Sequence, residues 1–358
     1  MAGGGAAAQM QGSAGSTAGR PNEACFPLSP QITADELSQR AAMKLAITLP
    51  ALTSDDPYER AGQLVDAVRG SLSGGSGGFP AVWLHDFVLH RFMDDSSTGK
   101  PAPLSPEIGL DVEASMAVET KLAIAHWIGD EHATLSALLT DDTVFLDDNL
   151  AAHYGISHAF TQQWEAVPQP ASERAGILTL GPFLARFPSA PRRAVQLVQS
   201  LGCSQAPPAP PVPVSVWDDP GHPSAKDIVT EQYGDTTSPT CKACHQIYVG
   251  YGIALDRYDA VGRYRSTLGG KPIDTSYSLY LGYDQDGEQV DFASPQELGN
   301  ALSRARSVRS CLVRKFAESL GAREMTDPEL SCVLEKFDAS QGSFWSLFAD
   351  LSPAYLGN

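Results

Sequence analysis

Residues 241–265 read CKACHQIYVGYGIALDRYDAVGRYR, and this stretch carries the one strong functional signal in the chain. It begins with Cys241, Cys244 and His245, whose C-x-x-C-H spacing is the attachment signature of c-type haem. Two thiols three residues apart can each bond one porphyrin vinyl group, and the adjacent imidazole then ligates the iron from the proximal side. We therefore expect one covalent haem c bound by Cys241, Cys244 and His245, with His245 as the metal ligand.

Two other interpretations of this motif remain open. A zinc half-site would need two further Cys or His residues at short spacing, whereas Cys311 and Cys332 are 21 residues apart. A redox-active disulfide of the thioredoxin kind would follow a strand and open a helix, whereas Pro239 and Thr240 precede the motif here. The haem signature fits the sequence better than either pattern.

Other residues could complete a haem site. Arg263 and Arg265 either pair with the haem propionates through charge-assisted hydrogen bonds or form the solvated end of a turn. No spacing marks the sixth iron ligand, and helical core spacing favours a packing role for Met43 and Met116. The candidates are Met43, Met93, Met116, Met325, His85, His90, His126, His132, His153, His158 and His222.

The composition restricts the partners. The chain has 358 residues and a formal charge of −17, with 42% hydrophobic residues, which is enough for a buried core. Nucleic acids and anionic membranes attract clustered Lys and Arg, so this acidity argues against both. No stretch has the ~20 apolar residues of a transmembrane helix. The expected partner is a basic redox protein or a small organic substrate.

The N-terminus and the cysteines bear on the compartment. Residues 1–28 form a Gly/Ala/Ser-rich tether that we expect to be disordered, and they lack the basic and apolar regions of an intact signal peptide. They are either a tether left after a leader is removed, as in an outer-membrane lipoprotein, or a cytosolic N-terminus. Cys25, Cys203, Cys311 and Cys332 are scattered as disulfide partners are, with three pairings open, although four free thiols are the alternative. Covalent haem attachment favours a periplasmic or extracellular protein.

The fold class we expect is mainly α. Capping and apolar patterns predict helices over 33–48, 56–72, 79–93, 105–129 and 130–139, one from Ser294 to Gly321, and two opening at Thr326 and Ser343. A Pro-rich connector covers 205–213, and a small hairpin or loop region covers 263–292. Asp141-Asp142 and Asp147-Asp148 are expected at helix N-termini. We predict the tether, a helical domain at 29–165, a connector and haem segment at 166–275, and a C-terminal helical domain at 276–358.

The stretch 241–265 resembles a secreted multidomain family that is abundant in planctomycetes and also found in myxobacteria. There C-x-x-C-H is followed by Gly-Phe-Ala-Leu-Glu-x-Phe-Asp-x-x-Gly-x-x-Arg. The matching positions are Gly252, Ala254, Leu255, Tyr258, Asp259, Gly262 and Arg265, and Ile253 and Asp256 replace its Phe and Glu. Three other blocks also resemble the family, in the same order: 145–155 (FLDDNLAAHYG), 174–181 (RAGILTLG) and 201–208 (LGCSQAPP).

The resemblance implies a secreted, haem-associated protein and does not identify an activity. The chain departs from the family where Tyr248, Val249 and Gly250 replace Met-Asp-Pro, and where residues 185–193 are shorter and lack a His. Both departures leave the distal ligand undefined. Three functions are consistent with the sequence: a mono-haem electron-transfer protein resembling cytochrome c, a peroxidase- or oxygenase-like haem enzyme with an open distal site, and a cell-surface binding module in which the haem is accessory.

Overall fold

A computed structural model describes part of the chain. The described residues are 25–26, 36, 39, 53, 63–64, 66–67, 83–84, 86–95, 100–129, 133–204, 224–232, 249–281, 288–320 and 324–356. The predicted tether apart from Cys25 and Phe26, the Pro-rich connector and the C-x-x-C-H motif lie outside the described residues, as does most of the predicted helices over 33–48 and 56–72.

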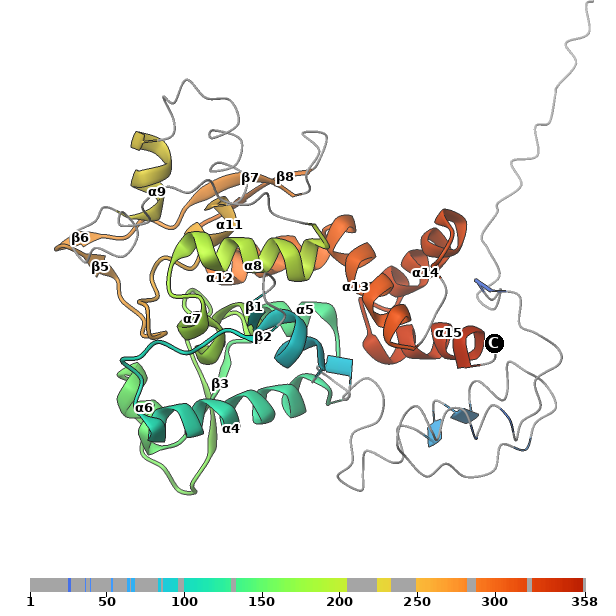
Figure 1. Cartoon of the computed structure of the whole chain (residues 1–358), viewed down its shortest axis with the longest axis horizontal. Coiled ribbons are helices and arrows are strands. Elements are labelled where there is room, and N and C mark those ends of the chain that lie inside the picture. Colours follow the sequence, from blue (N-terminus) through green and yellow to red (C-terminus); the bar gives the residue numbers. More distant parts are fainter. Residues whose placement is uncertain are drawn as a thin grey trace, which may run out of the picture.

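The first half of the described chain is mainly helical. Its helices are η1 (Phe87–Phe92), α4 (Leu110–Trp127), α5 (Leu135–Thr140), α6 (Asp148–Tyr154), η2 (Gly176–Thr179), α7 (Gly181–Arg186) and α8 (Ala190–Gly202). Two short hairpins interrupt them: β1 (Asp94–Asp95) with β2 (Lys100–Pro101), and β3 (Thr143–Leu146) with β4 (Glu165–Pro168). Figure 1 shows α4 and α6 on one side of the molecule and α8 near its centre.

The second half has the same character. Its helices are α9 (Ala225–Asp227), η3 (Ile228–Gln232), α11 (Gly250–Ile253), α12 (Pro295–Arg304), α13 (Arg306–Ser319), α14 (Asp327–Ala339) and α15 (Phe344–Leu356). The hairpins are β5 (Thr267–Leu268) with β6 (Lys271–Pro272), and β7 (Tyr277–Leu281) with β8 (Glu288–Phe292). The predicted mainly α fold class and the hairpin region at 263–292 are therefore confirmed. In Figure 1, α14 and α15 form one end of the molecule, joined through α13 to the centre.

Three apolar clusters hold these elements together. The largest runs from Phe26 to Leu351 and includes Trp83, Trp127 and Trp345. A second lies among α4, β3 and α6, where Met116, Leu146 and Leu150 are fully buried. The third is small and contains Ala190, Ala225, Val229, Val249 and Ile253. The division into four domains stays a prediction.

Several local predictions were wrong. The helix expected from Ser105 begins at Leu110, because Ser105–Ile108 form a turn closed by the Ile108 N–H on the Ser105 carbonyl, 3.0 Å away. The helix expected over 294–321 is broken at Ala305, whose extended ψ of 124° separates α12 from α13. The first half also contains strands, β1–β4, that the helical pattern did not predict.

The two aspartate pairs, Asp141-Asp142 and Asp147-Asp148, have different positions relative to the helices. Asp147 is the N-cap of α6, where its carboxylate accepts the Leu150 N–H at 2.9 Å, as predicted. Asp141 is instead at the C-terminal end of α5 and accepts the Thr143 N–H at 2.8 Å. The prediction that both pairs open helices was therefore wrong for Asp141-Asp142.

The four scattered cysteines form two disulfides. Cys25 bonds Cys332, with Cα atoms 5.5 Å apart, and Cys203 bonds Cys311, with Cα atoms 5.4 Å apart. The first attaches the N-terminal end of the described chain to α14, and the second joins the end of α8 to α13. Stable disulfides are usual in secreted and periplasmic proteins, and this chain fits that class.

Candidate functional site

The predicted haem attachment motif lies in the interval between η3 and α11. Cys241, Cys244 and His245 are outside the described residues, whereas Arg263 and Arg265 are within them. The candidate site is therefore assembled from the elements on either side of this interval. These elements are α9 and η3 before it, and α11 with the turn at 254–265 after it.

The elements that flank the interval are connected to each other. The Asp256 carboxylate accepts the Ala225 N–H at 2.7 Å, and Ser224 and Asp227 form a capping box at the start of α9. Lys226 Nζ contacts Asp274 at 2.5 Å. Because Ala225 and Val229 also share an apolar cluster with Val249 and Ile253, both flanks of the interval rest on one cluster.

The helix α11 is pressed against α8. A Cβ built on Gly252 would lie 1.9 Å from the Ala190 carbonyl oxygen, closer than any side chain can approach. Glycine at this position therefore permits the contact between the two backbones. Gly252 is one of the positions that resemble the planctomycete family. The close packing of α11 on α8 explains why a glycine is needed there.

Arg193 fixes the turn that follows α11. Its side chain is 1% exposed and donates five hydrogen bonds of 2.6–3.1 Å to backbone carbonyls. The acceptors belong to Leu184 and Phe187 before α8 and to Leu255, Tyr258 and Asp259 in the turn. Burial lowers the pKa of Arg193 to about 10, so the guanidinium stays charged at neutral pH. Arg193 thus joins the start of α8 to the turn, and it has no carboxylate partner among the described residues.

The two predicted propionate partners have different surroundings. Arg263 is half exposed and already pairs with Asp259, Nε to Oδ2 at 3.2 Å. Arg265 has a buried Nε that donates to no described residue, and its Nη2 makes only a long 3.4 Å contact with the Asp256 carbonyl. Arg265 therefore retains an unused donor, and Arg263 is largely occupied.

Three of the sequence blocks that resemble the family meet at Arg174. Its guanidinium carbon lies 5.1 Å from the ring centre of Tyr154 and 5.4 Å from that of Tyr258. Arg174 Nη1 also donates to the Thr179 carbonyl at 2.8 Å. Residues of the blocks 145–155, 174–181 and 241–265 are thus in contact in three dimensions, around one buried cation.

A buried acid pairs with this cluster. Glu119 is 1% exposed and accepts the Tyr154 hydroxyl at 2.8 Å. Burial raises the pKa of Glu119 to about 7, and burial with the nearby Glu119 charge raises the pKa of Tyr154 well above its ordinary value. Sequence reasoning missed Glu119, because one glutamate on a helix carries no motif. Tyr154 and Arg174 were within the quoted blocks but were not assigned a role.

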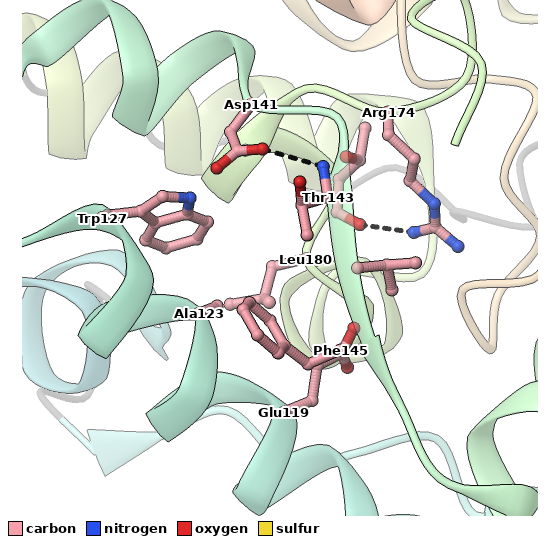
Figure 2. A pocket seen from close by; sticks show the side chains of 11 residues that line it. Glu119, Ala123, Trp127, Asp141, Thr143, Phe145, Arg174 and Leu180 are labelled. Carbon is pink, nitrogen blue, oxygen red and sulfur yellow. Dashed lines mark hydrogen bonds between the residues drawn. The ribbon is translucent and has the colours of Figure 1, made fainter. Parts of the chain in front are cut away.

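Glu119 and Arg174 also line a small pocket between α4, β3 and η2. Figure 2 shows Trp127, Phe145 and Asp141 among the side chains that line it, with the Asp141 carboxylate accepting the Thr143 backbone N–H. His126 lies 2.8 Å from the Asp141 carboxylate. Neither Arg263 nor Arg265, the two described residues that the sequence predicts for the haem, lines this pocket.

The described candidates for the sixth iron ligand are mostly engaged elsewhere. Met93, Met116 and Met325 are at most 5% exposed and pack in the core, as expected for Met116. His126 and His158 pair with Asp141 and Glu165, and His153 contacts the Val261 carbonyl. His90 lies 3.8 Å from Asp94. The remaining candidates, Met43, His85, His132 and His222, lie outside the described residues.

Two family models match the chain in separate segments. Residues 78–156 match PSD4, "Protein of unknown function (DUF1592)", and residues 174–268 match PSCyt3, "Protein of unknown function (DUF1588)". Both matches fit the planctomycete-type family that the sequence resembles. The second match contains residues 241–245, Arg174, Arg193 and the turn after α11. No curated protein and no solved structure matches the chain.

The described residues are compatible with haem but do not by themselves hold a metal. Within them, no group of three or more His, Cys, Asp or Glu side chains could bind a metal ion. No helix of the described chain is long and apolar enough to cross a membrane. The buried, unused Nε of Arg265 fits a haem carboxylate, and the apolar cluster at Val249 and Ile253 provides a fixed support directly after the motif.

Proposed function

We propose that this chain is a secreted or periplasmic mono-haem protein resembling cytochrome c, which binds its haem covalently and transfers single electrons to a partner. The observation that carries the proposal is the C-x-x-C-H motif at Cys241, Cys244 and His245, within the segment matching PSCyt3. The two disulfides support an oxidising compartment, where covalent haem attachment takes place.

The chain's own residues would hold the group in this proposal. Cys241 and Cys244 provide thioether bonds, and His245 provides the proximal imidazole. Arg265 provides an N–H that a propionate could accept, which makes it the better of the two predicted arginines. Haem iron bound there supplies a one-electron couple between its ferric and ferrous states.

The scaffold around the motif suits electron transfer, because a redox centre that moves little has a small reorganisation cost. Asp256, Lys226 and Arg193 fix the elements on either side of the motif to each other and to α8. The net charge of −17 predicts a basic partner, with association that weakens as the salt concentration rises.

A second candidate is a haem-dependent oxidoreductase with an open distal face and a small organic substrate. The observation that favours it is that most described candidates for the sixth iron ligand already have other contacts. The methionines Met93, Met116 and Met325 pack in the core. The histidines His126, His153 and His158 are hydrogen bonded or paired with a carboxylate. A haem without a sixth protein ligand can bind O₂ or peroxide.

One optical experiment separates the two functions. The full chain is produced in a host with cytochrome c maturation, and its spectrum is recorded in the ferric form and in the ferrous form before and after CO is added. Electron transfer predicts a six-coordinate low-spin haem that does not respond to CO. A high-spin ferric form with ready CO binding would favour the oxidoreductase, and a protein without haem would reject both.

A further inference from the structure

The Cys203–Cys311 disulfide joins an exposed residue to a buried one. Cys203, at the C-terminal end of α8, is exposed, whereas Cys311 on α13 is 2% exposed. An external thiolate attacks a disulfide at the sulfur it can reach, and the other sulfur becomes the leaving group. The geometry therefore defines a direction of attack, with Cys203 as the target and Cys311 as the leaving thiolate. In the Cys25–Cys332 disulfide both residues are partly buried.

The backbone at Cys203 is strained. Its φ of 51° and ψ of 31° place it in the left-handed region, which residues with a Cβ rarely adopt. Neither Cys25 nor Cys332 has a positive φ. The left-handed backbone thus distinguishes Cys203 from both cysteines of the other disulfide.

A cation lies beside the leaving sulfur. Lys315 is one helical turn after Cys311 on α13, and its Nζ donates to the Ser200 carbonyl at 2.9 Å. Cys311 Sγ lies 3.8 Å from the same oxygen, so the sulfur and the ammonium nitrogen are at most 6.7 Å apart, the sum of the two distances. Burial lowers the pKa of Lys315 to about 8, and the side chain is still mostly charged at neutral pH. A nearby cation stabilises a thiolate and makes it a better leaving group.

The helix α8 does not depend on this disulfide for its position. Gln196 Nε2 donates to the carbonyls of Phe92 and Asp94 at 2.9 and 3.1 Å, and Ser200 Oγ donates to the Arg91 carbonyl at 2.8 Å. Arg193 holds the other end of the helix. The disulfide can therefore open while α8 stays in place.

We propose that Cys203–Cys311 is a thiol–disulfide exchange site that accepts electrons from the dithiol of a CxxC-type oxidoreductase. A thiolate of the reductant attacks Cys203 Sγ, a mixed disulfide forms, and the Cys203–Cys311 bond breaks with its electron pair on Cys311 Sγ. The second thiol of the reductant then attacks the mixed disulfide, which releases Cys203 as a thiol and leaves the reductant oxidised. This site is independent of the haem proposal, because none of its residues belongs to the motif.

The direct test compares the two disulfides within one sample. The native full chain is treated with dithiothreitol, quenched with acid at intervals, alkylated and analysed by peptide mass spectrometry, which reports each cysteine separately. Cys203–Cys311 should open at least about tenfold faster than Cys25–Cys332. Equal rates, or faster opening of Cys25–Cys332, would overturn the proposal. With reduced glutathione as the probe, the mixed disulfide should be found on Cys203, and its appearance on Cys311 would also overturn it.

Variants of Lys315 separate electrostatic assistance from simple packing. Lys315→Met should slow the opening of Cys203–Cys311 about tenfold, because the leaving thiolate loses its cation, and Lys315→Arg should restore most of the rate. If Lys315 served only to hold α8 against α13, its removal would loosen the contact and speed the opening instead. The opening of Cys25–Cys332 in the same variants is the internal control and should not change.

Discussion

Replacing Arg193 by methionine should destabilise the fold more than any other single change around the candidate site. The guanidinium donates to five backbone carbonyls, those of Leu184, Phe187, Leu255, Tyr258 and Asp259. Two of them keep a second donor, because the Leu255 carbonyl also accepts the Tyr258 N–H and the Asp259 carbonyl also accepts the Gly262 N–H. Each of the other three acceptors, left without the guanidinium, costs about 1–3 kcal/mol, although the costs overlap when the backbone relaxes. We therefore expect a loss of at least about 3 kcal/mol, a large fraction of the ~5–15 kcal/mol by which domains are stable.

The assay is urea unfolding followed by circular dichroism, with both disulfides intact. Arg192→Met is the matched control, because Arg192 is the adjacent residue on α8 and is exposed, and it should change the free energy of unfolding by less than about 0.5 kcal/mol. Because Arg193 also holds the turn after α11, the Arg193→Met variant should incorporate less haem in the same host. A loss below about 1 kcal/mol for Arg193→Met would refute the idea that these five bonds fix the turn.

Two further changes test the buried acid and the packing of α11. Burial raises the pKa of Glu119 from 4.5 to about 7, so the folded chain is favoured below pH 4.5 and loses about 3 kcal/mol of stability as the pH rises to 7. Glu119→Gln should remove that loss. The difference in unfolding free energy between the variant and the native chain should therefore be more favourable to the variant at pH 8 than at pH 4. The same difference at both pH values would contradict the raised pKa. Gly252→Ala should cost about 2 kcal/mol or more, because its Cβ would overlap the Ala190 carbonyl. Gly109→Ala, with nothing within 4 Å of its Cβ, should cost less than about 1 kcal/mol, the preference for glycine over alanine at the N-cap of α4. Similar unfolding midpoints for the two alanine variants would exclude the close contact.

Local patterns in the sequence predicted much of the secondary structure. The capping box at Thr326 and Glu329 opens α14 as expected, and Asp147 caps α6. These signals are readable because a cap depends on residues within one turn of each other. The break at Ala305 was not predictable in this way, since neither Pro nor Gly marks it and Ala305 is buried by tertiary packing.

Contacts between residues far apart in the sequence could not be predicted in the same way. Four scattered cysteines indicate disulfides. Because any of them could pair with any other, the sequence does not identify Cys203 and Cys311 as partners. Arg193 was also missed, because its acceptors are backbone carbonyls as far away as Asp259, and a carbonyl has no sequence signature. Three blocks of resemblance were recognised in order along the chain, yet only the structure places Tyr154, Arg174 and Tyr258 in contact.

The most direct test of the haem proposal is whether haem remains attached to the denatured chain. The full protein is produced with cytochrome c maturation, extracted with acidified acetone and analysed by mass spectrometry. We predict that one haem stays on the peptide containing Cys241 and Cys244, and that the double variant Cys241→Ala/Cys244→Ala retains none. Recovery of that peptide from the native sequence without haem, with its two cysteines joined as a disulfide or free for alkylation, would contradict the proposal.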